Sequence, residues 1–250
     1  MNKPIGVFDS GIGGLSVLKK IKELLPDEDY IYYADSLHNP YGSKNGDELL
    51  NITSNIVDYL LEKNCKIIVI ACNTATTVCM KELREKYKDT IFVGVVPAIK
   101  VAYDHGSKNT LVLATPYTVK SKRVDELVAT YKHNDQNITL VPCHNLAHTI
   151  EFGTEKDIIA VLDNELKDYR DQDFDTVVLG CTHYSMIKKL IQSYIPKAEI
   201  IDGNLGVARE TKHQLELNSQ INIDGTGNID FISSEINNKL NLKEVYSKIE

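Results

Sequence analysis

A short buried strand followed at once by small and polar residues constrains this chain most, and the pattern occurs twice. Residues 67–70, Ile-Ile-Val-Ile, are branched and apolar throughout, which predicts a parallel strand buried on both faces. Cys72 follows this strand, just before a helical stretch at about 76–87. Residues 176–184 repeat the pattern, with Cys181 at the matching place 109 positions later. Ligands of open α/β sheets bind at the carboxyl ends of strands, so both thiols are expected at functional positions.

The second half of the sequence repeats the plan of the first. The strand predicted at 5–8 and its polar loop match the strand predicted at 111–114 and its loop. Strands that alternate with helices predict parallel sheets with right-handed crossovers. We therefore expect an α/β fold of two pseudo-symmetric, doubly wound domains with mainly parallel sheets and an active site in the cleft between them. The expected domains are 1–97 plus 208–250, on the Cys72 side, and 98–207, on the Cys181 side.

Composition is typical of a soluble globular protein. At 250 residues, with 42% hydrophobic and 25% charged residues, the chain is long enough for one large core or two domains. No apolar run approaches the roughly 20 residues of a membrane span, and Asp9 interrupts any signal-peptide core. We therefore expect a cytoplasmic protein with no membrane partner. The net charge of −7 disfavours nucleic acid as the main partner.

The five cysteines form no CxxC pair, and their odd number fits reduced thiols better than a disulfide framework. Cys65, Cys79 and Cys143 are interpreted as small buried hydrophobic residues. Cys72 and Cys181 differ because each lies where a strand leads into a helix. There the positive end of the helix dipole can lower the pKa of a thiol from about 8.5 toward neutral. Two such thiols at matched places indicate a functional pair.

A glycine-rich turn after the first predicted strand is compatible with a dinucleotide site, but it lacks one required residue. Gly11 and Gly13 fit the fingerprint, and Asp35 follows the next strand about 20 residues on. The third glycine position holds Ser16, which disfavours this interpretation. A helix start capped by the preceding Asp or Ser explains the turn more simply, so we expect no cofactor.

Two histidines, His144 and His148, have the i, i+4 spacing of a zinc-binding helix. Asn145 stands where a metalloprotease carries its general-base glutamate, and no third ligand is evident. We therefore interpret both histidines as facing solvent and expect no metal.

Several motifs, taken together and in this order, resemble those of glutamate racemases. The similarity runs from residue 5 to about residue 205, most of the chain. The wider superfamily, which includes aspartate and hydantoin racemases, shares the two cysteines but is less similar around Asp9 and Tyr41. The motifs that carry the resemblance are Asp9-Ser10-Gly-Ile-Gly-Gly-Leu-Ser, Pro40-Tyr41-Gly42, Ala71-Cys72-Asn73-Thr74-Ala75, Gly94-Val-Val-Pro-Ala98, Ala114-Thr115-x-x-Thr118 and Gly180-Cys181-Thr182-His183-Tyr184.

The resemblance implies a cofactor-independent racemase, a homodimer, that acts at Cα of glutamate and supplies D-glutamate for cell-wall peptidoglycan. It implies that Cys72 takes the α-proton from one enantiomer while Cys181 protonates the opposite face. Asp9 and His183 match residues that assist the two thiols. The resemblance also implies a set of substrate-binding positions, among which Glu151 matches an acidic residue near the cleft. These positions are Asp9, Ser10, Tyr41, Gly42, Asn73, Thr74, Thr115, Thr118, Glu151, Thr182 and His183.

Elementary chemistry agrees with this assignment. Inverting a stereocentre by proton transfer requires a base on one face and an acid on the other, and a thiolate and a thiol satisfy this in both directions. The motif loops contain almost no Lys or Arg, so backbone N–H groups, hydroxyls and amides are expected to hold the substrate carboxylates. One alternative is a racemase of aspartate or another acidic amino acid. Another is a non-catalytic amino-acid-binding module, although pure binding does not need two thiols.

Overall fold

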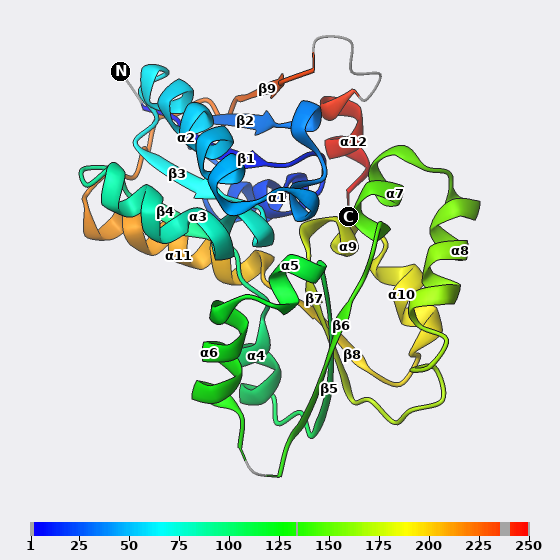
Figure 1. Cartoon of the computed structure of the whole chain (residues 1–250). Helices are drawn as coiled ribbons and strands as arrows, with labels where there is room; N and C mark the ends of the chain where they lie inside the picture. Colours follow the sequence, from blue (N-terminus) through cyan, green and yellow to red (C-terminus); the bar gives the residue numbers. More distant parts are fainter. Residues whose placement is uncertain (1–2, 134, 236–240, 250) are drawn as a thin grey trace. The chain divides into compact units, whose positions relative to one another are not determined.

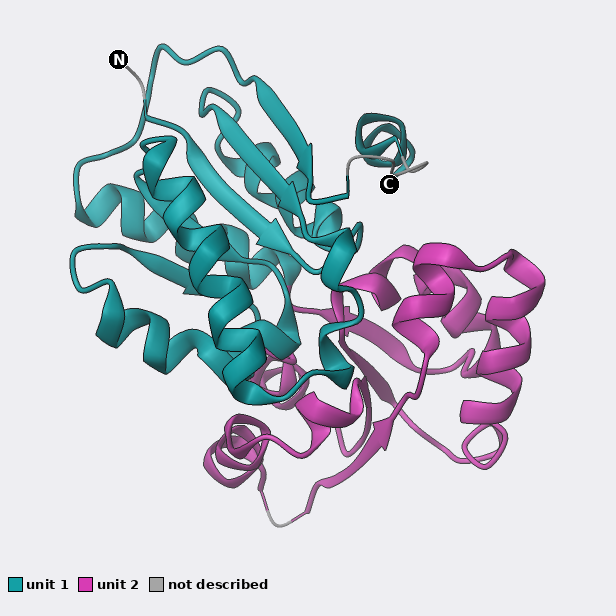
Figure 2. Cartoon of the chain, turned by 45° about the horizontal axis from the view of Figure 1, so that its top comes forward, with its two compact units in different colours: residues 1–95, 204–250 teal, residues 96–203 magenta. Residues whose placement is uncertain are grey.

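Figure 1 shows a computed structural model of the chain, which describes residues 3–133, 135–235 and 241–249. The chain divides into two units, coloured separately in Figure 2. Unit 1 comprises Met1–Val95 and Asn204–Glu250, and unit 2 comprises Val96–Gly203. Unit 1 is therefore built from two separate stretches of sequence.

The sheet of unit 1 has five parallel strands in the order β4-β3-β1-β2-β9. Strands β1 and β3 are adjacent in the interior of the sheet and are buried along their whole length, which explains their continuous apolar sequences. Strand β9, from the C-terminal region, pairs with β2 and forms an edge of the sheet, so the C-terminal region is part of this unit. The strands are β1 (Ile5–Asp9), β2 (Tyr30–Ala34), β3 (Ile67–Ile70), β4 (Phe92–Gly94) and β9 (Ile229–Ser233).

Helices cover both faces of this sheet. Helices α2 and α3 pack together over Phe8, Ile68 and Ile70, and α1 packs against α11 (Figure 1). The apolar residues of α1 recur at helical spacing, so its buried stripe faces the core. Two short 3-10 helices, η1 (Ser36–His38) and η2 (Tyr41–Ser43), follow β2. The α-helices of unit 1 are α1 (Leu15–Leu24), α2 (Gly46–Glu62), α3 (Asn73–Lys86), α11 (Asn204–Leu217) and α12 (Leu242–Lys248).

The sheet of unit 2 has four parallel strands in the order β6-β5-β7-β8. One hydrophobic core, around Val112, Val124 and Val178, lies between the sheet and helices α4 and α6. A second core, around Leu113, Leu146 and Tyr184, lies between the sheet and helices α7 to α10. The strands are β5 (Asn109–Ala114), β6 (Asn137–Pro142), β7 (Thr176–Gly180) and β8 (Glu199–Asp202). The helices are α4 (Ile99–Asp104), α5 (Pro116–Val119), α6 (Lys122–Tyr131), α7 (Leu146–Phe152), α8 (Glu155–Glu165), α9 (Thr182–Met186) and α10 (Lys188–Tyr194).

The two sheets share one strand order. Read from one edge, unit 1 runs β4-β3-β1-β2 and unit 2 runs β8-β7-β5-β6, so β1 corresponds to β5 and β3 to β7. These are the strand pairs that the sequence repeat matched. The predicted fold class, two α/β sheets with mainly parallel strands and flanking helices, is confirmed. In the described part of the chain, no helix combines the length and the apolar character that a membrane crossing requires.

Candidate active site

The candidate site residues of unit 1 lie at the carboxyl edge of its sheet. Asp9 is the last residue of β1, and its buried carboxylate accepts a 2.8 Å hydrogen bond from the backbone N–H of Gly14. Only glycine fits at position 14, because a Cβ there would lie 2.6 Å from the Cβ of Asp9 and 2.9 Å from the hydroxyl of Tyr32. The turn after β1 therefore fixes the direction in which the Asp9 side chain points.

Cys72 occupies the position between β3 and α3. Its backbone is extended, and its carbonyl accepts from the N–H of Thr76 at 2.9 Å, which begins the helix. The backbone of Ala71 also bonds to the carbonyl of Phe8, so the residue before the thiol is still held by β1. The thiol residue is 6% exposed and faces the N-terminus of a 14-residue helix.

Asn73, the first residue of α3, carries a buried polar group without a partner. Its side chain is 3% exposed, and its Nδ2 finds no hydrogen-bond acceptor among the described residues. Buried polar groups are nearly always paired, so an orphan donor beside Cys72 indicates a place where a ligand accepts.

Tyr41 is held in the same unit by a small polar cluster. Its hydroxyl donates to Asp35 Oδ2 at 2.7 Å, and His38 Nδ1 lies 2.8 Å from Asp35 Oδ1. Burial and the neighbouring Asp35 carboxylate raise the pKa of Tyr41 well above its usual value, so the phenol stays a donor. Gly42 follows within η2. The sequence suggested Asp35 only as part of a dinucleotide fingerprint; in the structure its carboxylate bonds instead to these two side chains.

The candidate residues of unit 2 form a chain of contacts that ends at a thiol. Cys181 follows β7 and is 7% exposed. Its Sγ lies 3.9 Å from Nδ1 of His183, and Nε2 of His183 lies 2.6 Å from Oε2 of Glu151, which belongs to α7. The two partners of the imidazole are side chains that are both nearly inaccessible to solvent.

The contacts of His183 decide its charge. Burial opposes protonation, but the hydrogen bonds to Cys181 and Glu151 outweigh it and hold the pKa of His183 well above 6.5. The imidazole is therefore a cation at neutral pH that can donate from both nitrogens.

Two threonines and the residue after Cys181 complete the candidate positions of unit 2. Thr115 caps α5, and its hydroxyl donates to that of Thr118 at 3.0 Å. Both threonines are buried, as is Thr182. All three lie at the carboxyl edge of the second sheet, because β5 and β7 are neighbours and end side by side.

The other three cysteines lie in core packing. Burial raises the pKa of Cys65 to about 12. Burial also raises the pKa of Cys79, to about 11, and outweighs a hydrogen bond with Thr53 that lowers it. Burial also raises the pKa of Cys143. These thiols stay protonated, which fits the interpretation of them as hydrophobic residues.

The two histidines with zinc-like spacing are exposed, and the ring of His148 lies 4.9 Å from that of Phe152. Within the described ranges, no group of three or more His, Cys, Asp or Glu side chains is arranged to hold a metal ion.

Each of the two units has a parallel sheet with a cysteine just beyond the end of a buried strand, Cys72 after β3 and Cys181 after β7. This repeated arrangement defines the class of protein to which the chain belongs. A sequence profile of the family described as Asp/Glu/Hydantoin racemase matches residues 5–211. The chain belongs to this family.

Its relatives narrow the class further. The curated "Glutamate racemase" of Clostridium botulinum (strain Alaska E43 / Type E3) is 42% identical over 244 residues, covering 96% of this chain and 94% of the relative. A crystal structure of glutamate racemase from Francisella tularensis in complex with D-glutamate matches with a TM-score of 0.84 and 29% identity, covering 98% of this chain and 92% of that one. The Escherichia coli glutamate racemase in complex with L-glutamate and the activator UDP-MurNAc-ala matches with a TM-score of 0.81 and 31% identity, over 98% and 92% of the two chains.

Proposed function

We propose that this protein is a glutamate racemase, which interconverts L- and D-glutamate without a cofactor. The observation that carries the proposal is the pair of thiols, because each sheet presents one at the carboxyl end of a buried strand, Cys72 after β3 and Cys181 after β7. Relatives that are about 42% identical over most of the chain are named glutamate racemases.

In the proposed reaction, the Cys72 thiolate removes the α-proton of one enantiomer, and the Cys181 thiol delivers a proton to the opposite face of Cα. The roles exchange in the reverse direction, so the enzyme returns to its starting state only after a second, opposite turnover or after proton exchange with solvent. His183 assists Cys181 through its cationic imidazole and is itself oriented by Glu151. Asp9 assists Cys72.

The substrate carboxylates need donors, and the proposed donors are mainly neutral. The orphan Nδ2 of Asn73 supports this assignment, since a buried amide beside Cys72 gains a partner when a carboxylate binds. The N-terminus of α3 adds backbone N–H groups and a favourable dipole. The other proposed contacts are hydroxyl and backbone groups, from Ser10, Tyr41, Gly42, Thr74, Thr115, Thr118 and Thr182.

Circular dichroism of D-glutamate, with purified protein and no additive, tests the proposal directly. Racemisation is expected in both directions and is expected to fall by at least about 10²–10⁴-fold in Cys72→Ala and in Cys181→Ala, because each variant lacks one proton-transfer group. Cys65→Ala is the matched control, since it removes a thiol from the core of unit 1. Wild-type rates in either active-site variant would refute the two-thiol mechanism.

Aspartate is the main alternative to glutamate as the substrate. It is one methylene shorter, a difference worth about 1–3 kcal/mol in a fitted pocket. We expect kcat/KM for aspartate to be about 10–100-fold lower than for glutamate, and the opposite ranking would assign the protein to the aspartate racemases. Glutamate that binds tightly without turning over would instead favour a non-catalytic binding module.

We further propose that the D-glutamate produced enters peptidoglycan synthesis, and that the enzyme is a cytoplasmic homodimer. Expression of the chain in a bacterium that requires D-glutamate is expected to restore growth, whereas the Cys181→Ala form is expected to fail. Light scattering of the purified protein tests the dimer.

A further inference from the structure

Two buried tyrosines of β2 hold the two ends of helix α1. They lie two residues apart in the strand, so both side chains point to the same face of the sheet. The hydroxyl of Tyr30 donates at 2.6 Å to the carbonyl of Leu25, where α1 ends. The hydroxyl of Tyr32 donates at 2.7 Å to the carbonyl of Gly11, in the turn between β1 and α1. The same kind of bond therefore anchors a helix end in one case and the turn after Asp9 in the other.

The hydroxyl of Tyr32 lies against this turn at a second point, because a Cβ at Gly14 would come within 2.9 Å of it. The backbone N–H of Gly14 donates to Asp9 Oδ2 at 2.8 Å. Both Gly11 and the Tyr32 side chain are buried. A buried carbonyl that loses its donor is costly, so removing the hydroxyl is expected to shift the turn and, with it, the bond between Gly14 and Asp9.

The C-terminal region holds the ring of Tyr32 in place. Phe231 of β9 is the strand partner of Tyr32, and the centroids of their two rings are 6.4 Å apart. The ring of Phe231 is in turn 5.6 Å from that of Tyr246 in α12. Both distances are within the range in which tilted aromatic pairs attract each other. The Tyr32 hydroxyl is therefore fixed by ring packing at one end of the side chain and by its hydrogen bond at the other.

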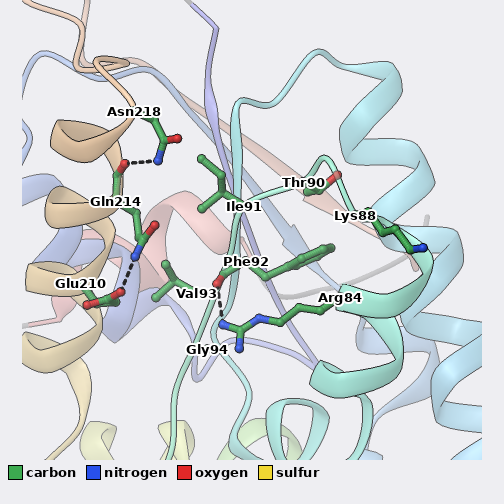
Figure 3. A pocket seen from close by; sticks show the side chains of 10 residues that line it. All are labelled: Arg84, Lys88, Thr90, Ile91, Phe92, Val93, Gly94, Glu210, Gln214 and Asn218. Carbon is green, nitrogen blue, oxygen red and sulfur yellow. Dashed lines mark hydrogen bonds between the residues drawn. The ribbon is translucent and has the colours of Figure 1, made fainter.

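Side chains that bond to backbone carbonyls connect helices to strands elsewhere in this unit as well. At the β4 edge of the sheet, Arg84 Nη2 of α3 donates to the carbonyl of Phe92 at 3.0 Å (Figure 3). Tyr32 differs from Arg84 in what its bond holds, because the carbonyl of Gly11 belongs to the turn that orients a candidate catalytic carboxylate.

We propose that Tyr32 is a positioning residue for Asp9 in the proposed racemase reaction, and the proposal rests on that function. Tyr32 holds the carbonyl of Gly11, and the turn so fixed keeps the N–H of Gly14 on the Asp9 carboxylate. Strands β1 and β3 are paired neighbours, so Asp9 and Cys72 lie at strand ends that are side by side. Misplacing a catalytic group by about 1 Å can cost about 100-fold in rate, so this remote hydrogen bond matters to the reaction.

Tyr32→Phe tests the proposal, with Tyr30→Phe as the matched control. Both variants remove a buried hydroxyl of the same strand from a bond to a backbone carbonyl, so both are expected to lower the melting temperature by similar amounts. Racemisation, followed by circular dichroism, should separate them. We expect kcat/KM for glutamate to fall about tenfold in Tyr32→Phe and to stay within about twofold of wild type in Tyr30→Phe.

Two further measurements show whether the effect passes through Asp9, which a general loss of stability would not mimic. In the Asp9→Ala background, Tyr32→Phe is expected to lower the residual kcat/KM by less than about twofold, because the group that it positions is already gone. Hydrogen exchange of the Gly14 amide, followed by NMR of ¹⁵N-labelled protein, is expected to be about tenfold faster in Tyr32→Phe than in Tyr30→Phe.

Equal kcat/KM in the two tyrosine variants, an undiminished loss in the Asp9→Ala background, or equal exchange of the Gly14 amide would overturn the proposal. A wild-type protein that does not racemise glutamate would instead contradict the proposed function, and the Gly14 exchange would still decide whether Tyr32 fixes the turn. If Tyr32→Phe does not fold, Phe231→Leu takes its place, because it loosens the Tyr32 ring and leaves the hydroxyl. Its Gly14 exchange should rise and its kcat/KM should fall, and wild-type values for both would overturn the proposal.

Discussion

Replacing Lys66 by methionine is expected to destabilise unit 1 by about 3–4 kcal/mol, because the change strands a buried carboxylate. Lys66 Nζ lies 2.6 Å from Glu28 Oε2, and the two side chains are only 3% and 1% exposed. Among the described residues no other hydrogen-bond donor reaches Oε2, so this oxygen depends on the ammonium group alone.

The magnitude follows from what the stranded carboxylate must do. It either stays charged without a countercharge or takes up a proton, and protonating a glutamate at its reference pKa costs about 3.7 kcal/mol at pH 7. For a chain of this size, a loss of that order lowers the melting temperature by about 6–16 °C.

A double variant separates the lost charge from the lost packing. Glu28 Oε1 also accepts the backbone N–H of Asn222 at 2.8 Å, and glutamine at position 28 can keep that bond. We therefore expect Glu28→Gln combined with Lys66→Met to be more stable than Lys66→Met alone. Urea unfolding, followed by circular dichroism, gives the three free energies of unfolding.

The control is Lys81→Met, which removes a lysine that is 81% exposed and 3.9 Å from Glu85. Exposed pairs of this kind contribute little, so a change of at most about 0.5 kcal/mol is expected. The reasoning is wrong if Lys66→Met costs less than about 1 kcal/mol, or if the double variant is the least stable of the set.

Three further changes probe the candidate site. Glu151→Gln is expected to lower the pKa of His183, because it removes the carboxylate 2.6 Å away, and the imidazole ¹⁵N shifts should titrate at lower pH than in wild type. A histidine whose pKa is raised by folding stabilises the folded state fully at pH values below its unfolded-state pKa of about 6.5. This stabilisation is lost as the pH rises through the folded-state pKa, so the variant should lose it at a lower pH than wild type. Asp35→Asn weakens the anchor of Tyr41, and we expect kcat/KM to fall about tenfold while the melting temperature changes little; an unchanged kcat/KM would contradict that role. Gly14→Ala forces a Cβ to within 2.6 Å of the Asp9 side chain, so both stability and racemisation should drop, and wild-type values for both would show that the turn can relax.

The alternation of elements could be predicted because buried parallel strands have continuous apolar sequences. β3 and β7 show this most clearly, and each is fully buried in the structure. The position of Cys72 and Cys181 at strand ends follows from the same pattern. The order of strands does not, since nothing local in residues 229–233 indicates that β9 pairs with β2.

Side-chain contacts between distant elements also lay beyond local patterns. His183 and Glu151 are 32 residues apart and come from different helices, so their hydrogen bond required the folded chain. Asp35 shows the opposite case. Its position after β2 marked it as a candidate, but whether it would hold a ligand or anchor Tyr41 depended on the fold of η1 and η2.

The late arrival of β9 bears on how the protein folds as it leaves the ribosome. Strand β2, Tyr-Ile-Tyr-Tyr-Ala, pairs with β1 on one side and with β9 on the other. Roughly 200 residues are synthesised between β2 and β9, which at 5–20 residues per second takes about 10–40 s. Throughout that interval an aromatic strand edge is open to pairing with other nascent chains. Ribosome-bound chains that end before residue 229 should therefore depend on chaperones more strongly than the finished protein does.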